Sequence, residues 1–99
     1  MLKIDKKIKG DSCIVTLDGK VDMVTSVQLE SEIEHFSGHV KELIIDCTGL
    51  VYISSAGLRV LVATQKRMDG TGKLVLKNVQ KSVMEILAVT GMSRIIAIE

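Results

Sequence analysis

Three consecutive aliphatic residues, Leu43, Ile44 and Ile45, constrain the fold of this chain more than any other stretch. Neighbouring side chains in a strand point to opposite faces, so three in a row predict a strand that is buried on both faces. We expect this strand to span residues 40–46. Strands buried on both faces are typical of parallel sheets, in which helices carry the chain from one strand to the next.

Two strands are predicted before this one. Leu2, Ile4 and Ile8 alternate with charged residues, which indicates a half-exposed first strand. A turn signal follows, and residues 13–17 are expected to form a second strand that pairs with the first as an antiparallel hairpin. Asp18-Gly19 is interpreted as the end of that strand and the start of a loop.

Three later stretches have apolar residues at the spacing of an amphipathic helix. The first is expected to begin at a cap formed by Thr25 or Ser26 and to end near Gly38. The second runs over about residues 55–69 and the third over residues 80–90. Their predicted inward-facing residues are Leu29, Ile33 and Phe36, then Leu58, Leu61, Val62 and Met68, and finally Val83, Ile86 and Leu87.

Residues 73–77 and 94–98 are predicted to form the last two strands. Strands that alternate with helices imply right-handed crossovers and parallel pairing. The predicted fold class is therefore α/β, with one domain over residues 1–99. It is built on a mixed sheet of about five strands, an N-terminal hairpin followed by parallel strands, with about three helices packed on it.

Composition argues against several classes of function. Apolar residues make up 46% and charged residues 25% of the chain, and a net charge of +1 with 2% aromatic residues argues against nucleic-acid binding. Cys13 and Cys47 are too few for a disulfide scaffold or a zinc site, which favours buried thiols in a reducing compartment. Without a signal sequence or a long apolar run, we expect a cytoplasmic protein without direct membrane contact.

Residues that could perform catalysis do not come together in the sequence. His35 and His39 have no cysteine or carboxylate at metal-ligand spacing. The chain has neither a phosphate-binding loop nor a dinucleotide fingerprint, and Ser54 and Ser55 lack the flanking glycines of a nucleophile elbow. We therefore expect no enzyme activity, no cofactor and no metal site.

Small polar residues are expected to gather at one rim of the sheet, where the strands end. Asp22 and Thr25 follow the second strand, Asp46 and Thr48 follow the third, and the serine pair precedes the second helix. A helix start stabilises a phosphate through its free N–H groups and partial positive charge. Each residue also has an ordinary explanation: an N-cap for either serine, an Asx-turn for Asp46 and a loop carboxylate for Asp22.

Two motifs resemble the STAS domain of anti-sigma factor antagonists. The run from Asp46 to Leu58, Asp-Cys-Thr-Gly-Leu-Val-Tyr-Ile-Ser-Ser-Ala-Gly-Leu, is similar to the family's signature. The run Leu17-Asp-Gly-Lys-Val-Asp22, with Thr25 nearby, is similar to its second conserved stretch. The predicted order of strands and helices also matches, so the resemblance covers essentially the whole chain.

This resemblance implies a regulator without catalysis of its own. Members of the family bind an anti-sigma factor that is itself a serine kinase, and so free a sigma factor. The kinase uses ATP and magnesium to phosphorylate one serine at the start of the second helix, which breaks the complex, and a PP2C-type serine phosphatase restores it. By position that serine is Ser55, with Ser54 as a rival acceptor.

The resemblance also assigns roles to neighbouring residues. Asp46 and Thr48 are expected to hold the loop that carries the serines. Gly57 is expected to leave room for the kinase active site, and Arg59 to touch the partner. The predicted partner-binding residues are Asp22, Thr25, Ser54, Ser55, Ala56, Gly57 and Arg59.

The chain departs from the family pattern at three places. Ser54 stands where many members have Asp, and Ala56 where a second serine is common. Relatives often continue with a final helix beyond the position of Glu99; its lack either exposes apolar surface for a dimer or leaves a smaller domain, with a monomer as the default. Two other functions stay open, a subunit or scaffold of a lipid transporter or sensor complex and a small anion- or nucleotide-binding module.

Overall fold

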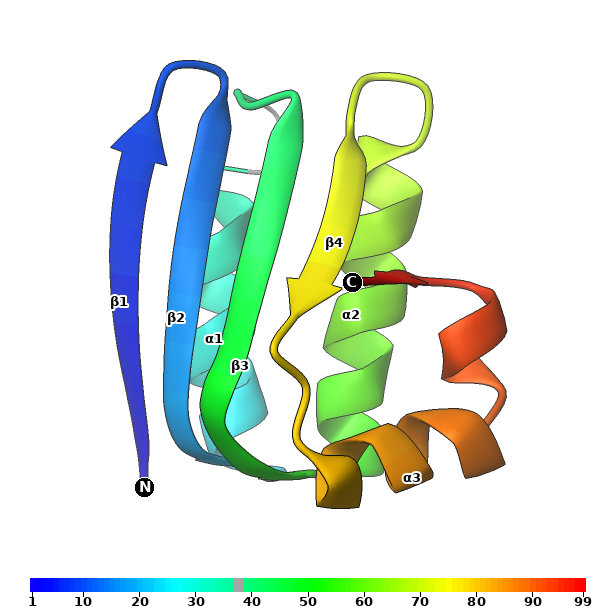
Figure 1. Ribbon diagram of the computed structural model, residues 1–99. Coiled ribbons are helices and arrows are strands. Elements are labelled where there is room, and N and C mark those ends of the chain that lie inside the picture. The colour runs from blue at the N-terminus through cyan, green and yellow to red at the C-terminus, as the bar shows by residue number, and fades with distance from the viewer. Residues whose placement is uncertain (37–38) are drawn as a thin grey trace.

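Figure 1 shows a computed structural model of the chain, which describes residues 1–36 and 39–99. A five-stranded sheet has the strand order β1-β2-β3-β4-β5. In the figure α1 and α2 lie behind the sheet, and α3 crosses near its lower end. The elements are β1 (Leu2–Lys9), β2 (Ser12–Val21), α1 (Thr25–Glu34), β3 (Glu42–Ile53), α2 (Ser55–Met68), β4 (Lys73–Lys77), α3 (Lys81–Val89), the 3-10 helix η1 (Met92–Arg94) and β5 (Ala97–Ile98).

The sheet is mixed, with one antiparallel pair at its edge. β1 and β2 pair antiparallel, from Leu2 opposite Gly19 to Lys9 opposite Ser12. The pairs β2–β3, β3–β4 and β4–β5 are all parallel. The predicted α/β class, with an N-terminal hairpin and later parallel strands, is confirmed, and residues 1–36 and 39–99 contain three α-helices.

β3 is a central strand and is buried on both faces, as predicted. Leu43 and Ile45 are fully buried in the core between the sheet and the helices. Ile44 points to the opposite face, where it is 9% exposed and lies beside the buried Val75 of β4. This burial anchors the first half of β3, whereas Val51 and Tyr52 near its carboxyl end are 45% and 44% exposed.

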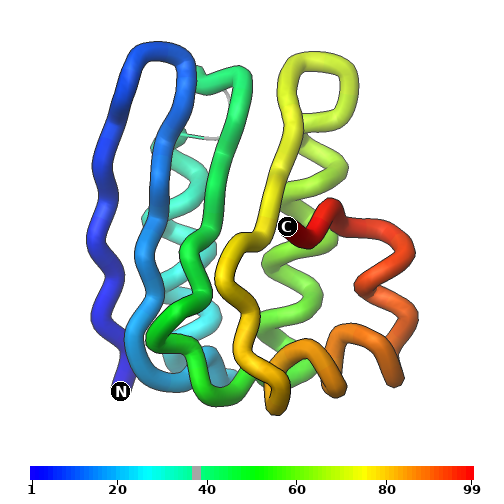
Figure 2. The backbone as a smooth tube through the Cα atoms, in the orientation of Figure 1, coloured from blue at the N-terminus to red at the C-terminus, as the bar shows by residue number. Residues whose placement is uncertain are grey.

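β2 and β3 extend further than expected, which corrects two predicted strand ends. β2 continues through Asp18 and Gly19, and β3 continues past Asp46 to Ile53. Two register irregularities in the β2–β3 ladder absorb the extra residues of β3, and both strands bend in the lower half of Figure 2. Gly19 has a φ of +118°, and a Cβ there would collide with the Met1 carbonyl oxygen. Glycine at this position therefore allows β2 to pass close to Met1 and does not mark the start of a loop.

The helices bury most of the predicted stripes. Leu29, Ile33, Leu58, Leu61, Met68, Val83 and Leu87 are buried, whereas Phe36, Val62 and Ile86 are only half-buried. α2 buries Val60 and Thr64 in addition, and the Thr64 hydroxyl donates to the Val60 carbonyl oxygen at 2.7 Å. The predicted end of the first helix at Gly38 lies outside the described residues.

The last strand is shorter than predicted. Only Ala97–Ile98 pairs with β4. The N–H groups of Ile95 and Ile96 both donate to the carbonyl oxygen of Met92 at 3.0 Å, which holds these residues against the end of η1 rather than in the sheet. The strand predicted over residues 94–98 is therefore wrong in its first three residues.

Cys13 and Cys47 are buried, with exposed fractions of 0% and 1%. Burial raises the pKa of both thiols, that of Cys47 to about 12. Because the thiolate is the reactive form, we predict that neither thiol reacts appreciably with iodoacetamide at about pH 8 while the protein is folded. Both should react in denaturant, and intact-protein mass spectrometry compares the two states. Rapid modification of the folded protein would contradict the buried placement.

Candidate functional site

The carboxyl ends of β2 and β3 are joined by a backbone hydrogen bond. The N–H of Ser54, just after β3, donates to the carbonyl oxygen of Val21, the last residue of β2, at 2.8 Å. Asp22 therefore lies one residue from the contact that holds the start of α2. The predicted gathering of these two strand ends at one rim is found, at the lower end of the sheet in Figure 1.

The two adjacent serines have different environments. Ser54 is the N-cap of α2: its Oγ accepts from the N–H of Gly57 at 3.3 Å, and its carbonyl oxygen accepts from the N–H of Leu58 at 2.9 Å. Ser55 is the first residue of the helix, and its side chain is exposed. The N-cap explanation therefore applies to Ser54, and it does not explain Ser55.

Asp22 organises the start of α1. Its Oδ1 accepts from the N–H groups of Val24 (3.0 Å) and Thr25 (2.8 Å) and lies 3.1 Å from the Thr25 hydroxyl oxygen. These hydrogen bonds, led by those from Thr25, lower the pKa of the Asp22 carboxyl. α1 begins at Thr25, with Val24 in the cap position and no capping side chain there. The predicted cap at Thr25 or Ser26 is wrong, because the Asp22 carboxylate already accepts from the first N–H groups.

Thr25 closes the same turn from the other side. Its Oγ1 accepts from the N–H of Asp22 at 2.8 Å and lies 2.9 Å from the carbonyl oxygen of Lys20. The single hydroxyl proton can go to that carbonyl oxygen or to the Asp22 carboxylate, one at a time. Asp22 and Thr25 are both half-buried, so they shape the rim while part of each side chain stays accessible.

Asp46 and Thr48 support a different connection from the one expected. Asp46 Oδ1 accepts from Oγ1 and the N–H of Thr48 (2.6 and 3.0 Å) and from Nδ2 of Asn78 (3.1 Å), which lowers the pKa of Asp46. Gln80 donates from Nε2 to the Thr48 carbonyl oxygen. These bonds hold the β4–α3 connection rather than the serine turn, because β3 continues beyond Asp46 to Ile53. The Asx-turn interpretation of Asp46 is confirmed.

Gly57 faces the core, which corrects the role expected for it. The residue is buried, and a Cβ there would come within 2.6 Å of Cγ1 atoms in both Val21 and Ile53. Overpacking of this kind costs about 1–3 kcal/mol in a packed core. Glycine lets α2 approach the ends of β2 and β3 closely, and it offers no surface to a visiting enzyme.

Ala56 and Arg59 lie on the same first turn of α2. Ala56 is half-buried, and Arg59 is exposed one helical turn after Ser55. Both line a hollow of about 320 Å³ between α1 and α2, with Val27 on the α1 side. This hollow and the exposed Ser55 are therefore neighbouring features of one surface.

Sequence reasoning missed three exposed apolar residues around the start of α1. Met23, Val24 and Val27 are 76%, 79% and 67% exposed. The signal for Val27 was its position off the stripe that contains Leu29 and Ile33, since an apolar residue off the buried face of a helix stays in solvent. Met23 and Val24 precede α1 and had no such signal. Grouped next to Asp22, they supply apolar surface of the kind that protein partners cover.

The described residues contain no metal-binding group. No three or more His, Cys, Asp or Glu residues within residues 1–36 and 39–99 are placed to hold a metal ion. Across the same ranges, none of the helices has both the length and the apolar character that crossing a membrane requires. His35 and His39 are both exposed.

Comparisons with known proteins define the family. Residues 3–99 match the sequence model of the STAS domain. BtrV of Bordetella bronchiseptica, whose name describes it as an anti-sigma factor antagonist, is 34% identical over 87 residues, which cover 86% of this chain and 74% of BtrV. The chain therefore belongs to the STAS domain family. Its relative BtrV carries the name of one group within that family, the anti-sigma factor antagonists.

Solved structures share the fold at lower identity. An anti-sigma factor antagonist from Mycobacterium paratuberculosis superposes with a TM-score of 0.90 at 20% identity, over 99% of this chain and 85% of the other. SpoIIAA in its unphosphorylated form gives a TM-score of 0.82 at 15% identity, over 100% and 88%. Bacillus SpoIIAA in its phosphorylated form gives 0.73 at 16% identity, over 100% and 91%. These similarities show a common fold.

We predict that Asp22→Asn destabilises the protein at neutral pH and that the difference disappears in acid. The pKa of Asp22 lies below its ordinary value of 3.8 in the folded state, so the ionised form stabilises folding above that pH. This stabilisation is lost as the pH falls through the folded-state pKa. Urea unfolding of both proteins from about pH 2 to pH 7 measures it. A difference in unfolding free energy that stays constant with pH would contradict it.

Proposed function

We propose that this protein is an anti-sigma factor antagonist that works by partner switching. In its unphosphorylated form it binds an anti-sigma factor that is also a serine kinase, so that a sigma factor is released. Phosphorylation of Ser55 by that kinase ends the binding, and a PP2C-type serine phosphatase restores it. The protein acts in the cytoplasm as a monomer and has no catalytic activity of its own.

The observation that carries this proposal is the exposed Ser55 side chain at the first position of α2. The Ser54 hydroxyl is engaged with the N–H of Gly57, and its side chain is half-buried. A kinase must take hold of a hydroxyl that projects from the surface, so Ser55 is the favoured acceptor. The identity to BtrV and the existence of SpoIIAA in a phosphorylated form support the proposal.

The fold can accept a phosphate on Ser55 without unfolding. N–H groups in the first turn of a helix have no intrahelical partners and carry partial positive charge. A phosphoserine adds about −1.5 to −2 charges at neutral pH, which these groups stabilise. A partner surface that packs against the uncharged hydroxyl would instead meet a hydrated dianion. A cost of about 3 kcal/mol for that encounter lowers the affinity about 100-fold.

The docking surface in this proposal is the rim around Ser55. Asp22 and Thr25 hold its shape through their mutual hydrogen bonds. Met23 and Val24 supply exposed apolar area beside them. Protein interfaces combine such an apolar centre with a polar border, so the rim offers both parts within one short segment.

We predict that incubation with the cognate anti-sigma factor kinase, ATP and Mg²⁺ adds one phosphate to Ser55. Peptide mass spectrometry locates the group. Ser55→Ala should abolish the modification because the acceptor is gone, whereas Ser54→Ala should retain it. Phosphate found on Ser54, or on neither serine, would contradict the assignment.

Stability measurements provide the matched control for these two variants. Ser54→Ala removes an N-cap and should lower the free energy of unfolding by about 1 kcal/mol. Ser55→Ala changes an exposed side chain and should stay within about 0.5 kcal/mol of the wild type. The variant that is modified is thus the less stable one, so loss of phosphorylation in Ser55→Ala is not a consequence of unfolding.

Binding to the same kinase tests the charge mechanism. Ser55→Ala should bind about as tightly as the wild type, and Ser55→Glu about 100-fold more weakly, because the carboxylate mimics part of the phosphate charge. Isothermal titration calorimetry measures both. Ser82→Glu, which adds a carboxylate at an exposed serine of α3, is the control and should bind normally. Equal affinities for the alanine and glutamate variants at position 55 would overturn the mechanism.

A further inference from the structure

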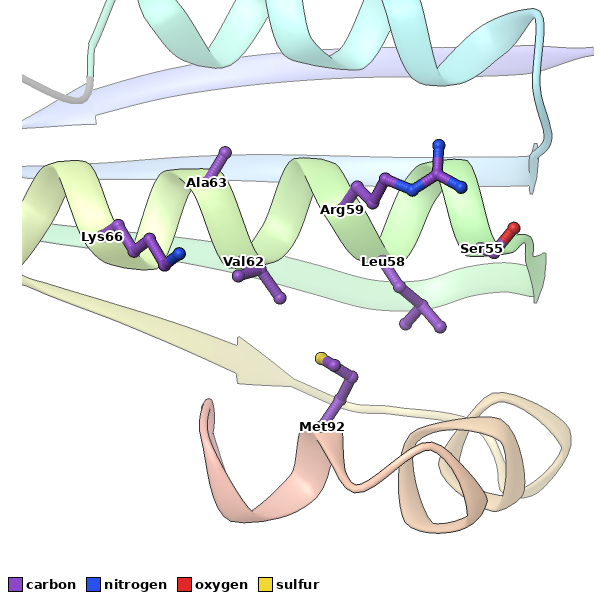
Figure 3. A pocket seen from close by; sticks show the side chains of 7 residues that line it. All are labelled: Ser55, Leu58, Arg59, Val62, Ala63, Lys66 and Met92. Atoms are coloured by element: carbon purple, nitrogen blue, oxygen red, sulfur yellow. The ribbon is translucent and has the colours of Figure 1, made fainter.

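α2 carries a second apolar stripe that is only partly covered. Its first stripe, with Leu61, Thr64 and Met68, faces the core. Leu58 and Val62 lie to one side of that stripe, toward η1 (Figure 3), and α1 lies on the other side of α2 (Figure 1). Val62 is half-buried although the sequence predicted it to face inward. Leu58 is buried, so the uncovered apolar surface of this lateral stripe belongs to Val62.

This stripe and Met92 of η1 form an open groove. Figure 3 shows Leu58 and Val62 pointing toward Met92, with Ser55 at one end of the groove and Lys66 at the other. The groove has a volume of about 450 Å³. Methionine adapts its flexible side chain to whatever packs on it, which suits the wall of a binding groove.

The charged groups on the groove are both cations. Arg59 and Lys66 are exposed and stand at positions i and i+7 of α2, so they lie about two turns apart along one border of the groove. The Arg59 side chain points away from Met92, toward α1, in Figure 3, and it also lines the hollow between α1 and α2. In the part of the chain that the structure describes, neither forms an ion pair, and no Asp or Glu lines the groove. The complementary surface is apolar along its centre and carries carboxylates on the flank that faces these two cations.

We propose that this groove binds an acidic amphipathic helix of the anti-sigma factor. The identity of that partner rests on the proposed function, whereas the chemistry of the helix follows from the groove. The groove extends along α2 from Ser55 to Lys66, about 16 Å, which is the length of three helical turns. Apart from Met92, the residues that line it all come from α2, so a small ligand would be enclosed on few sides and would stay largely in water. A helix can bury its apolar face there and keep its other faces solvated.

Ser55 makes the groove switchable. It lies at one end of the groove and four residues before Arg59, the spacing at which opposite charges pair on a helix. A phosphate on Ser55 neutralises the Arg59 cation and adds negative charge at the end of the groove. An acidic helix of the partner then finds one of the two groove cations neutralised and a negative charge beside it. Modification of Ser55 therefore weakens this groove for this partner in particular.

A peptide titration followed by NMR tests the proposal. The probe is a synthetic helix of about 18 residues, with leucines at i, i+3 and i+7 on one face and glutamates on both flanks. The comparison peptide has lysine in place of every glutamate. The acidic peptide should shift the amide signals of Leu58, Val62 and Met92, and the lysine peptide should not. Absence of these shifts with the acidic peptide would overturn the proposal.

Charge reversal in the groove sharpens this test. Lys66→Glu should weaken the acidic peptide about tenfold and allow the lysine peptide to bind at the same residues. Lys3→Glu is the matched control, because Lys3 lies on β1 at the opposite edge of the sheet, and it should change neither titration. Unchanged affinity in Lys66→Glu would overturn the role of the cations. A dimer seen by sedimentation and broken by Val62→Glu would assign the groove to a second copy and overturn the proposal.

The kinase complex separates this inference from the proposed function. If Ser55 is phosphorylated but Val62→Glu and Lys66→Glu bind the kinase normally, the groove proposal falls and the partner switch stands. If the kinase neither binds nor modifies the protein while the acidic peptide still occupies the groove, the proposed function falls and the groove chemistry stands. Circular dichroism of Val62→Glu should give the wild-type spectrum if the half-buried site tolerates the change, and Lys66→Glu, at an exposed position, carries the test if it does not.

Discussion

The backbone hydrogen bond from Ser54 to Val21 is the constraint on which the rest of the site depends. It fixes the N-cap residue of α2 against the end of β2, and that residue follows directly on β3, whose residues Leu43 to Ile45 are buried on both faces. Gly57 makes this closeness possible, because any side chain there would overlap Val21 and Ile53. The position of Ser55 at the surface is therefore set by packing beneath it, not by contacts of its own.

The same start point sets the rotation of the whole helix. Successive residues turn by about 100°, so capping at Ser54 places Gly57, Leu61 and Thr64 toward the core and Ser55 outward. A helix that began one residue later would rotate these faces and bury polar groups. The lateral stripe that faces η1 follows from this rotation too. One cap thus determines both the exposed serine and the groove beside it.

The elements that the sequence predicted well are those decided by local pattern, such as the doubly buried Leu43 to Ile45 strand and the stripes of the helices. The sequence-based prediction was wrong where contacts between distant segments determine the structure. Gly19 resembles a loop residue, but glycine is needed there because the Met1 backbone passes too close for a side chain. Register irregularities then let both strands continue. Asp46 is near the serines in sequence, yet its partner Asn78 comes from the end of β4. Neither contact leaves a signal in the neighbouring residues.

The charges around the proposed switch favour a local effect. The pKa values of Asp22 and Asp46 are both lowered, so these carboxylates stay ionised at neutral pH and provide a constant background. A phosphate would change the net charge from +1 to about −1, but charges farther apart than about 8 Å are largely screened in physiological salt. Arg59 is about one turn, about 6 Å along the axis, from Ser55, whereas Lys66 is about 16 Å away. The modification therefore acts on the near end of the groove and leaves the far cation in place, so affinity falls without the groove reversing its preference.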